Sequence, residues 1–149
     1  MSRSGRFCED GEKLKTRIIL GVIAGFLTWW VTFLAIAGLF VLLIPGYLEA
    51  GRLAQDQNDW SQFSNSMLLF MTAMYVVINP ITGWVTVFIT RNRNCVWATM
   101  APLILYAAHA HLYRLWNILP DWYNLAVVFL IPPLVYLGGR IVKLEPAQP

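Results

Sequence analysis

The sequence predicts an all-α membrane protein in which four transmembrane helices form an up-down bundle with no extramembrane domain. Charged residues make up 13% of the chain, about half the share that is usual in a soluble domain. Asp, Glu, Lys and Arg are also missing from four long tracts, residues 18–48, 60–90, 94–113 and 122–139. A helix needs roughly 17–25 mainly apolar residues to cross a bilayer, and each tract is long enough. A surface helix of a soluble protein would instead carry charges on one face.

The positions of Lys and Arg predict the orientation of the bundle. Nine of the eleven basic residues lie before the first tract, in the turn after the second or behind the fourth, and only Arg52 and Arg114 lie on the opposite side. Cytoplasmic loops carry the excess of Lys and Arg, so both termini should be cytoplasmic. This bias, with contact to anionic headgroups, accounts for the net charge of +3, and no nucleic-acid partner is expected.

The chain is expected to have three parts, a polar cytoplasmic N-terminal segment, a transmembrane domain and a short cytoplasmic tail, at residues 1–16, 17–142 and 143–149. The four helices are predicted at about residues 18–45, 61–90, 95–115 and 122–141. The first is too long for the core of a signal peptide and has no small-residue cleavage site, so it should remain as an anchor.

Turn and capping residues predict where the helices begin and end. The Pro45-Gly46 pair should end the first helix, and a loop should follow it. Asp59 and Gln62 have the spacing of a capping box, which would start the second helix just before the membrane. Asn94 and Asp121 are the expected caps of the third and fourth helices.

Aromatic residues gather at the predicted outer membrane boundary, as interfacial side chains do. They are Tyr47, Trp60, Tyr113, Trp116, Trp122 and Tyr123. Trp29 and Trp30 are the exception, because they fall near the middle of the first helix. A buried indole N–H needs an acceptor, which a neighbouring helix, a bound pigment or lipid, or another subunit could supply. Packing within the bundle is the favoured interpretation.

Small residues form a seam along one face of the first helix, at spacings of three and four: Gly21, Gly25, Thr28, Thr32 and Ala35. Small residues let membrane helices approach closely, which strengthens dispersion contacts between them. The seam is expected to meet either another helix of the same chain, the favoured alternative, or a partner protein.

A mildly polar face is predicted on the second helix, where Asn79, Thr82, Gly83 and Thr86 lie close to Pro80. One interpretation is the lining of a small polar pathway. The favoured one is hydrogen bonding between helices, because Thr and Asn can also satisfy the carbonyl that a proline leaves free.

Catalytic and transport chemistry finds little support. Proton-coupled transport needs an ionisable group at depth, and the four spans contain no Asp, Glu, Lys or Arg. His109 and His111 are weak metal candidates, because helical residues two apart point in nearly opposite directions and helical metal pairs are spaced i, i+4. Both are expected to hydrogen-bond to headgroups, water or the outer loop. No catalytic residue or cofactor is expected, although contact with a lipid or pigment stays open.

These features predict a non-catalytic integral membrane subunit, or an assembly or scaffold factor, of a larger membrane complex. Its expected partners are membrane lipids and other integral membrane subunits or copies of itself, and its expected location is the bacterial cytoplasmic (inner) membrane. The alternative is an oligomeric channel or facilitator for a small or lipidic solute, lined by the second helix.

Overall fold

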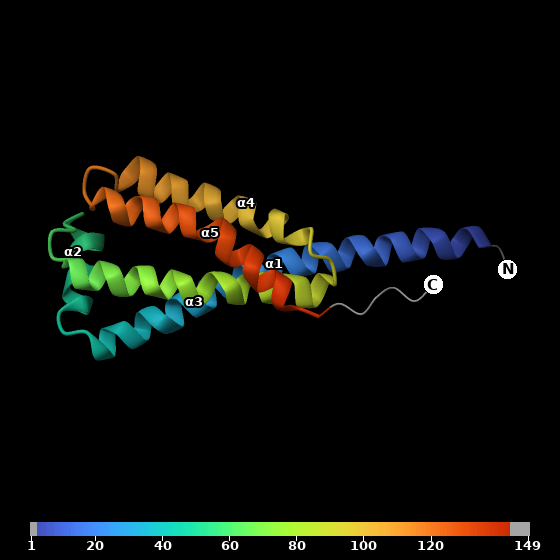
Figure 1. Cartoon of the computed structure of the whole chain (residues 1–149), viewed down its shortest axis with the longest axis horizontal. Coiled ribbons are helices and arrows are strands. Elements are labelled where there is room, and N and C mark those ends of the chain that lie inside the picture. Colours follow the sequence, from blue (N-terminus) through green and yellow to red (C-terminus); the bar gives the residue numbers. More distant parts are fainter. Residues whose placement is uncertain (1–2, 144–149) are drawn as a thin grey trace.

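The structure is a computed structural model that describes the backbone of residues 3–143 and the side chains of residues 15–143. Throughout these residues the regular structure is helical (Figure 1). The elements are α1 (Arg3–Leu43), α2 (Tyr47–Asp56), α3 (Asn65–Thr90), α4 (Cys95–Ala107), the π-helix η1 (Ala108–Arg114) and α5 (Asp121–Ile141).

Four helical segments are long and apolar enough to cross a membrane, which confirms the four predicted helices. They are Lys15–Leu43, Asn65–Thr90, Cys95–Arg114 and Asp121–Ile141, and the third combines α4 with η1. Successive segments run in opposite directions, so the start of α1 and the end of α5 lie at the same end of the bundle (Figure 1).

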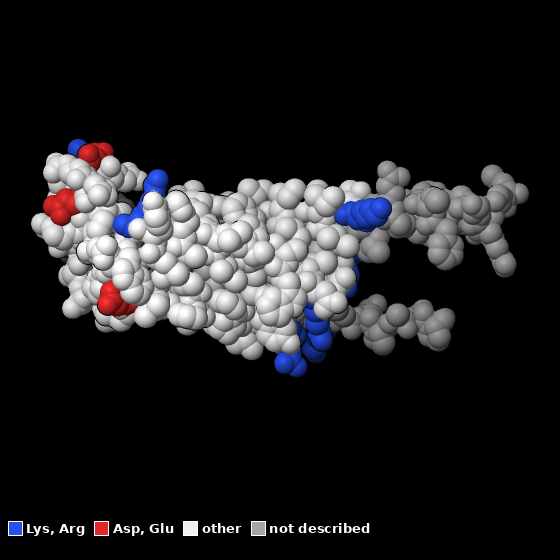
Figure 2. Space-filling view, turned by 90° about the horizontal axis from the view of Figure 1, so that it is seen from above, with Lys and Arg blue, Asp and Glu red and all other residues white. Residues whose placement is uncertain are grey.

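The charged side chains that Figure 2 shows gather at the two ends of the molecule, and the surface between them is uncharged in this view. The end that holds Arg17, Arg91, Arg93 and Arg140 is termed the basic end, and the opposite one, with α2 and its acidic residues, the far end. Two contacts tie the basic end together. Arg17 Nε donates to the Ile89 carbonyl at 2.9 Å, and Arg93 Nη2 donates to the Val142 carbonyl at 3.3 Å.

Helix α1 begins well before the predicted residue 18. It is helical from Arg3, so residues 3–16 continue the helix instead of forming a separate lead-in. Its 41 residues at about 1.5 Å each give a length of roughly 60 Å, about twice the hydrocarbon thickness of a bilayer. The first part of α1 therefore projects beyond the other helices at the basic end (Figure 1).

The segment between the first two spans contains a helix that the sequence analysis treats as loop. Gly46 has a φ of 80°, which turns the chain sharply into α2. Three residues of α2 at spacings of three and four are buried, Tyr47, Ala50 and Ala54. Helix α2 therefore packs on the far end through one face.

The predicted capping box at Asp59 and Gln62 is wrong. Hydrogen bonds from the side chain and the backbone N–H of Ser61 hold the pKa of the Asp59 carboxyl below its ordinary value, so that carboxylate closes a local turn. Ser64 caps the helix instead, because its Oγ accepts from the Met67 N–H at 3.3 Å. Helix α3 consequently starts at Asn65, four residues after the predicted position.

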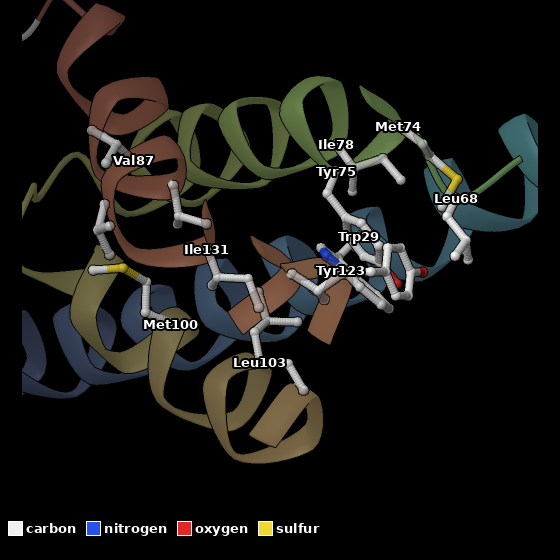
Figure 3. Close-up of a cluster of buried hydrophobic side chains, with 14 of the residues drawn as sticks. Trp29, Leu68, Met74, Tyr75, Ile78, Val87, Met100, Leu103, Tyr123 and Ile131 are labelled. Atoms are coloured by element: carbon white, nitrogen blue, oxygen red, sulfur yellow. The ribbon is translucent and has the colours of Figure 1, made fainter. Parts of the chain in front are cut away.

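Helix α3 is central, and it packs most extensively on α1 and α5. At its crossing with α5 the two backbones touch through glycines. A Cβ on Gly83 would overlap the Val135 carbonyl, and a Cβ on Gly138 would overlap the Pro80 carbonyl. The apolar core extends along this crossing and continues to α1 and α4, as the labelled side chains of Figure 3 show. The Gly138-Gly139 pair in the fourth span is a sequence signal of such a close approach.

Candidate functional site

His111 is buried among protein side chains and hydrogen-bonds to α5, a partner that the sequence analysis did not name. Its exposed fraction is 7%, and its Nδ1 lies 3.1 Å from Oδ1 of Asn124 on α5. The fully buried amide of Asn124 also donates through Nδ2 to the carbonyls of Leu115 (3.2 Å) and Leu119 (3.1 Å). Asn124 therefore ties η1, the following turn and α5 together.

The two donations by Asn124 fix the tautomer of a neutral His111. Because Nδ2 is the donor toward both carbonyls, Oδ1 is the acceptor, and His111 must supply the proton from Nδ1. The Nε2 atom then becomes a hydrogen-bond acceptor. No hydrogen bond to it occurs within the described residues.

His109 lies on the opposite side of η1, where it is exposed and stacks on Tyr113 with ring centroids 5.5 Å apart. The two histidines therefore point apart, as the helical spacing predicts. Among the described residues no group of three or more His, Cys, Asp or Glu side chains comes together to hold a metal ion.

The small-residue seam divides between two environments. Gly21 and Gly25 are buried against α3, where an added Cβ would overlap Thr90 and Thr86 respectively. Thr28 is half-buried and donates to the Ala24 carbonyl of its own helix at 2.7 Å. Thr32 is also half-buried, and Ala35 is exposed. The seam therefore packs within the chain at Gly21 and Gly25, whereas it faces outward at Ala35.

Trp29, one of the two central tryptophans, finds its acceptor on α3. Trp29 Nε1 donates to Asn79 Oδ1 at 3.2 Å, and Trp29 is 3% exposed while Asn79 is fully buried. Because an indole only donates, Oδ1 must face Trp29 and the Asn79 Nδ2 must face away. That Nδ2 is buried without a hydrogen-bond partner among the described residues. The two residues are thus brought together as one buried polar contact.

We expect this contact to be weak in a double-mutant cycle. Trp29→Phe, Asn79→Leu and the double variant should give a coupling free energy of about 0.6 kcal/mol, and not above about 1.7 kcal/mol, as is typical of hydrogen bonds between membrane helices. Thermal unfolding in detergent measures each corner of the cycle. A coupling of zero would contradict the hydrogen bond.

The remaining residues of the polar face pack inside the bundle. Thr82 donates to the Ile78 carbonyl and Thr86 to the Thr82 carbonyl, both at 3.0 Å, and Thr86 Oγ1 lies 3.1 Å from Thr99 Oγ1 on α4. Gly83 is covered by α5. The Thr86–Thr99 contact joins two helices, whereas the other two hydrogen bonds stay within α3.

A cavity of about 420 Å³ opens at the far end and reaches toward the middle of the bundle. Its lining comes from α1, α2, α3, the α4–η1 segment, the loop before α3, the turn before α5 and the first residues of α5. None of Asn79, Thr82, Gly83 and Thr86 lines it.

Aromatic rings form the deep wall of this cavity. Trp29 stacks on Phe33 with centroids 5.5 Å apart, and Trp30 meets Tyr106 edge to face at the same distance. Tyr75 lies 6.2 Å from Trp29 and also lines the cavity, and Figure 3 shows these two rings beside Tyr123.

Polar side chains lie toward the mouth. Gln55 and Asn58 come from α2 and the residues after it, and His111 and Arg114 come from η1. Sequence reasoning missed Arg114 and Tyr106, because the residues that line the cavity with them come from other elements of the chain.

The chain matches no known protein family, and no curated protein or solved structure matches it significantly.

Proposed function

We propose that the protein is a non-catalytic integral membrane subunit, or an assembly or scaffold factor, of a larger membrane complex, and that α1 contacts the partner. In this proposal the basic end faces the cytoplasm, which the charge bias supports. The membrane is the bacterial inner membrane, the simplest setting that is consistent with this bias. The partner is another integral membrane protein.

The observation that supports this proposal most strongly is the exposure of α1. Only 6% of its most apolar stretch is buried, compared with 44%, 39% and 33% for the other three spans. Helix α1 packs on α3 and α4 along one side only, which runs from Gly21 to Phe40. The other side of its apolar part is exposed, which leaves a long face for another protein.

The part of that exposed face nearest the C-terminal end of α1 has a shape against which a helix of a partner can pack. Val31, Ala35, Gly38 and Leu42 are spaced by four, three and four residues, which places them on one side of α1. All four are exposed, Val31 at 65% and Leu42 at 81%, and a Cβ added to Gly38 would meet nothing within 4 Å. Small residues flanked by large ones are typical of close helix contacts in membranes, whereas lipid chains gain little from them.

Replacing Gly38 with leucine tests this interface. We expect Gly38→Leu to reduce recovery of the partner about tenfold, because the added side chain separates the two helices. The tagged chain is purified from its own host in mild detergent, and native gels and mass spectrometry measure what remains bound. Thermal unfolding should stay unchanged, since the site is open in the isolated chain.

The matched control is Ala73→Leu, which adds bulk to an exposed position of α3. It should retain the partner. Equal recovery with Gly38→Leu and with wild type would contradict the proposed contact, and recovery of wild type without any partner would contradict the subunit function.

The alternative, an oligomeric channel or facilitator, is supported by one observation, the unpaired Nδ2 of Asn79 at depth. Isolation of the protein as a ring of identical copies would favour it. Solute flux into vesicles that contain this ring, measured with wild type and Asn79→Leu, would then decide between the two functions.

A further inference from the structure

The far-end cavity has the arrangement of an amphiphile site. Cavities of about 300–1,000 Å³ lined by aromatic residues with a few polar groups are the usual form of small-ligand sites, and this one measures about 420 Å³. Its apolar wall at Trp30, Phe33 and Tyr106 lies deep, within the spans, and its polar side chains lie at the level of α2. The polarity therefore changes along the cavity as it does across one leaflet of a membrane.

The charge at the mouth is positive. Arg114 is the only Lys, Arg, Asp or Glu among the lining residues. Within the part of the chain that the structure describes, its guanidinium makes no ion pair and no hydrogen bond. The other arginine of the far end, Arg52, lies 3.9 Å from Glu49 and does not line the cavity. An unpaired guanidinium can bind a phosphate through two parallel N–H···O bonds.

His111 adds a second polar group beside Arg114. Its ring lines the cavity, and its Nδ1 is occupied by Asn124. In the neutral ring Nε2 accepts a hydrogen bond, which a hydroxyl of a glycerol headgroup can donate. The mouth thus offers one cation and one acceptor to the same ligand.

We propose that this cavity binds an anionic glycerophospholipid of the leaflet at the far end. The phosphate lies at Arg114, a headgroup hydroxyl lies at His111, and one acyl chain follows the wall formed by Trp30, Phe33 and Tyr106. Helix α2, whose Ala54 and Gln55 line the cavity, covers the headgroup on the water side.

Quenching of tryptophan fluorescence by brominated lipid tests the proposal. The full-length protein is placed in phosphatidylcholine vesicles, and brominated phosphatidylglycerol is added at increasing low mole fractions. Trp29, Trp30 and Trp60 line the cavity, so we expect a saturable quenching component. Brominated phosphatidylcholine should give only the gradual quenching of exposed rings such as Trp84, Trp97 and Trp122. Equal curves for the two lipids would overturn the proposal.

Arg114→Gln should weaken the saturable component about tenfold, because a charge-assisted contact is lost. Arg52→Gln removes the same charge from the same end outside the cavity, and it should change nothing. An equal effect of the two variants would show surface attraction and overturn the site. Ala110→Phe, which places a ring in the cavity, should abolish the component in protein that unfolds at the wild-type temperature. Retention of the component in that protein would also overturn the proposal.

Discussion

Replacing Gly83 with alanine is expected to prevent α3 and α5 from packing closely against each other. A Cβ at this position would overlap the Val135 carbonyl of α5, and backbone atoms cannot move aside as a flexible side chain can. Gly138→Ala should act in the same way, because its Cβ would overlap the Pro80 carbonyl of α3. Overpacking usually costs about 1–3 kcal/mol and occasionally more, and we expect each variant to lose about 3 kcal/mol of unfolding free energy.

Thermal unfolding of the purified protein in detergent measures this loss. The matched control is Gly38→Ala, a helical glycine whose Cβ would meet nothing within 4 Å, and it should unfold at the wild-type temperature or above. If Gly83→Ala and Gly38→Ala unfold together, the close crossing of α3 and α5 is wrong.

Asn124→Leu is expected to have the second-largest effect. The side chain is fully buried and serves three partners. Leucine leaves His111 Nδ1 and the Leu119 carbonyl without a hydrogen bond among the described residues, whereas the Leu115 carbonyl keeps those from the Ile118 and Leu119 N–H groups. Each unsatisfied buried group costs about 1–3 kcal/mol, so two such groups should lower the unfolding free energy by roughly 2 kcal/mol. Thermal unfolding in detergent again provides the measurement.

Asn117→Leu is the control, because Asn117 is an exposed amide in the same turn. It should leave stability unchanged. A mild effect of Asn124→Leu, close to that of Asn117→Leu, would show that other groups or water satisfy His111 Nδ1 and the Leu119 carbonyl.

The long spans could be predicted because their signal is strong and local. A charge-free tract has one stable form in lipid, a helix, so the third and fourth spans end within one residue of the predicted positions. Helix α2 is short and polar, and the sequence-based prediction missed it although its buried residues Tyr47, Ala50 and Ala54 have helical spacing. The π-helix has no sequence signal comparable to proline or glycine.

In the candidate sites, too, single residues could be recognised from the sequence, whereas their partners in the fold could not. Trp29 and Asn79 each stood out as polar groups at depth, but their pairing depends on how α1 crosses α3, which no periodicity specifies. His111 looked interfacial because its neighbours in sequence are Tyr113 and Arg114. Its burial comes from the π-helix and from Asn124 on a later helix. The cavity joins residues from most of the elements, so it emerges only with the tertiary structure.

The glycine crossing between α3 and α5 also bears on biosynthesis. The ribosome makes α5 after α3, so α3 must wait in the bilayer with Gly83 uncovered until α5 has left the translocon. Helix α1 packs mainly on α3, which is already made, and its other side stays exposed during that interval. A nascent chain of this kind is therefore able to meet an assembly partner through its first helix before its own bundle has closed.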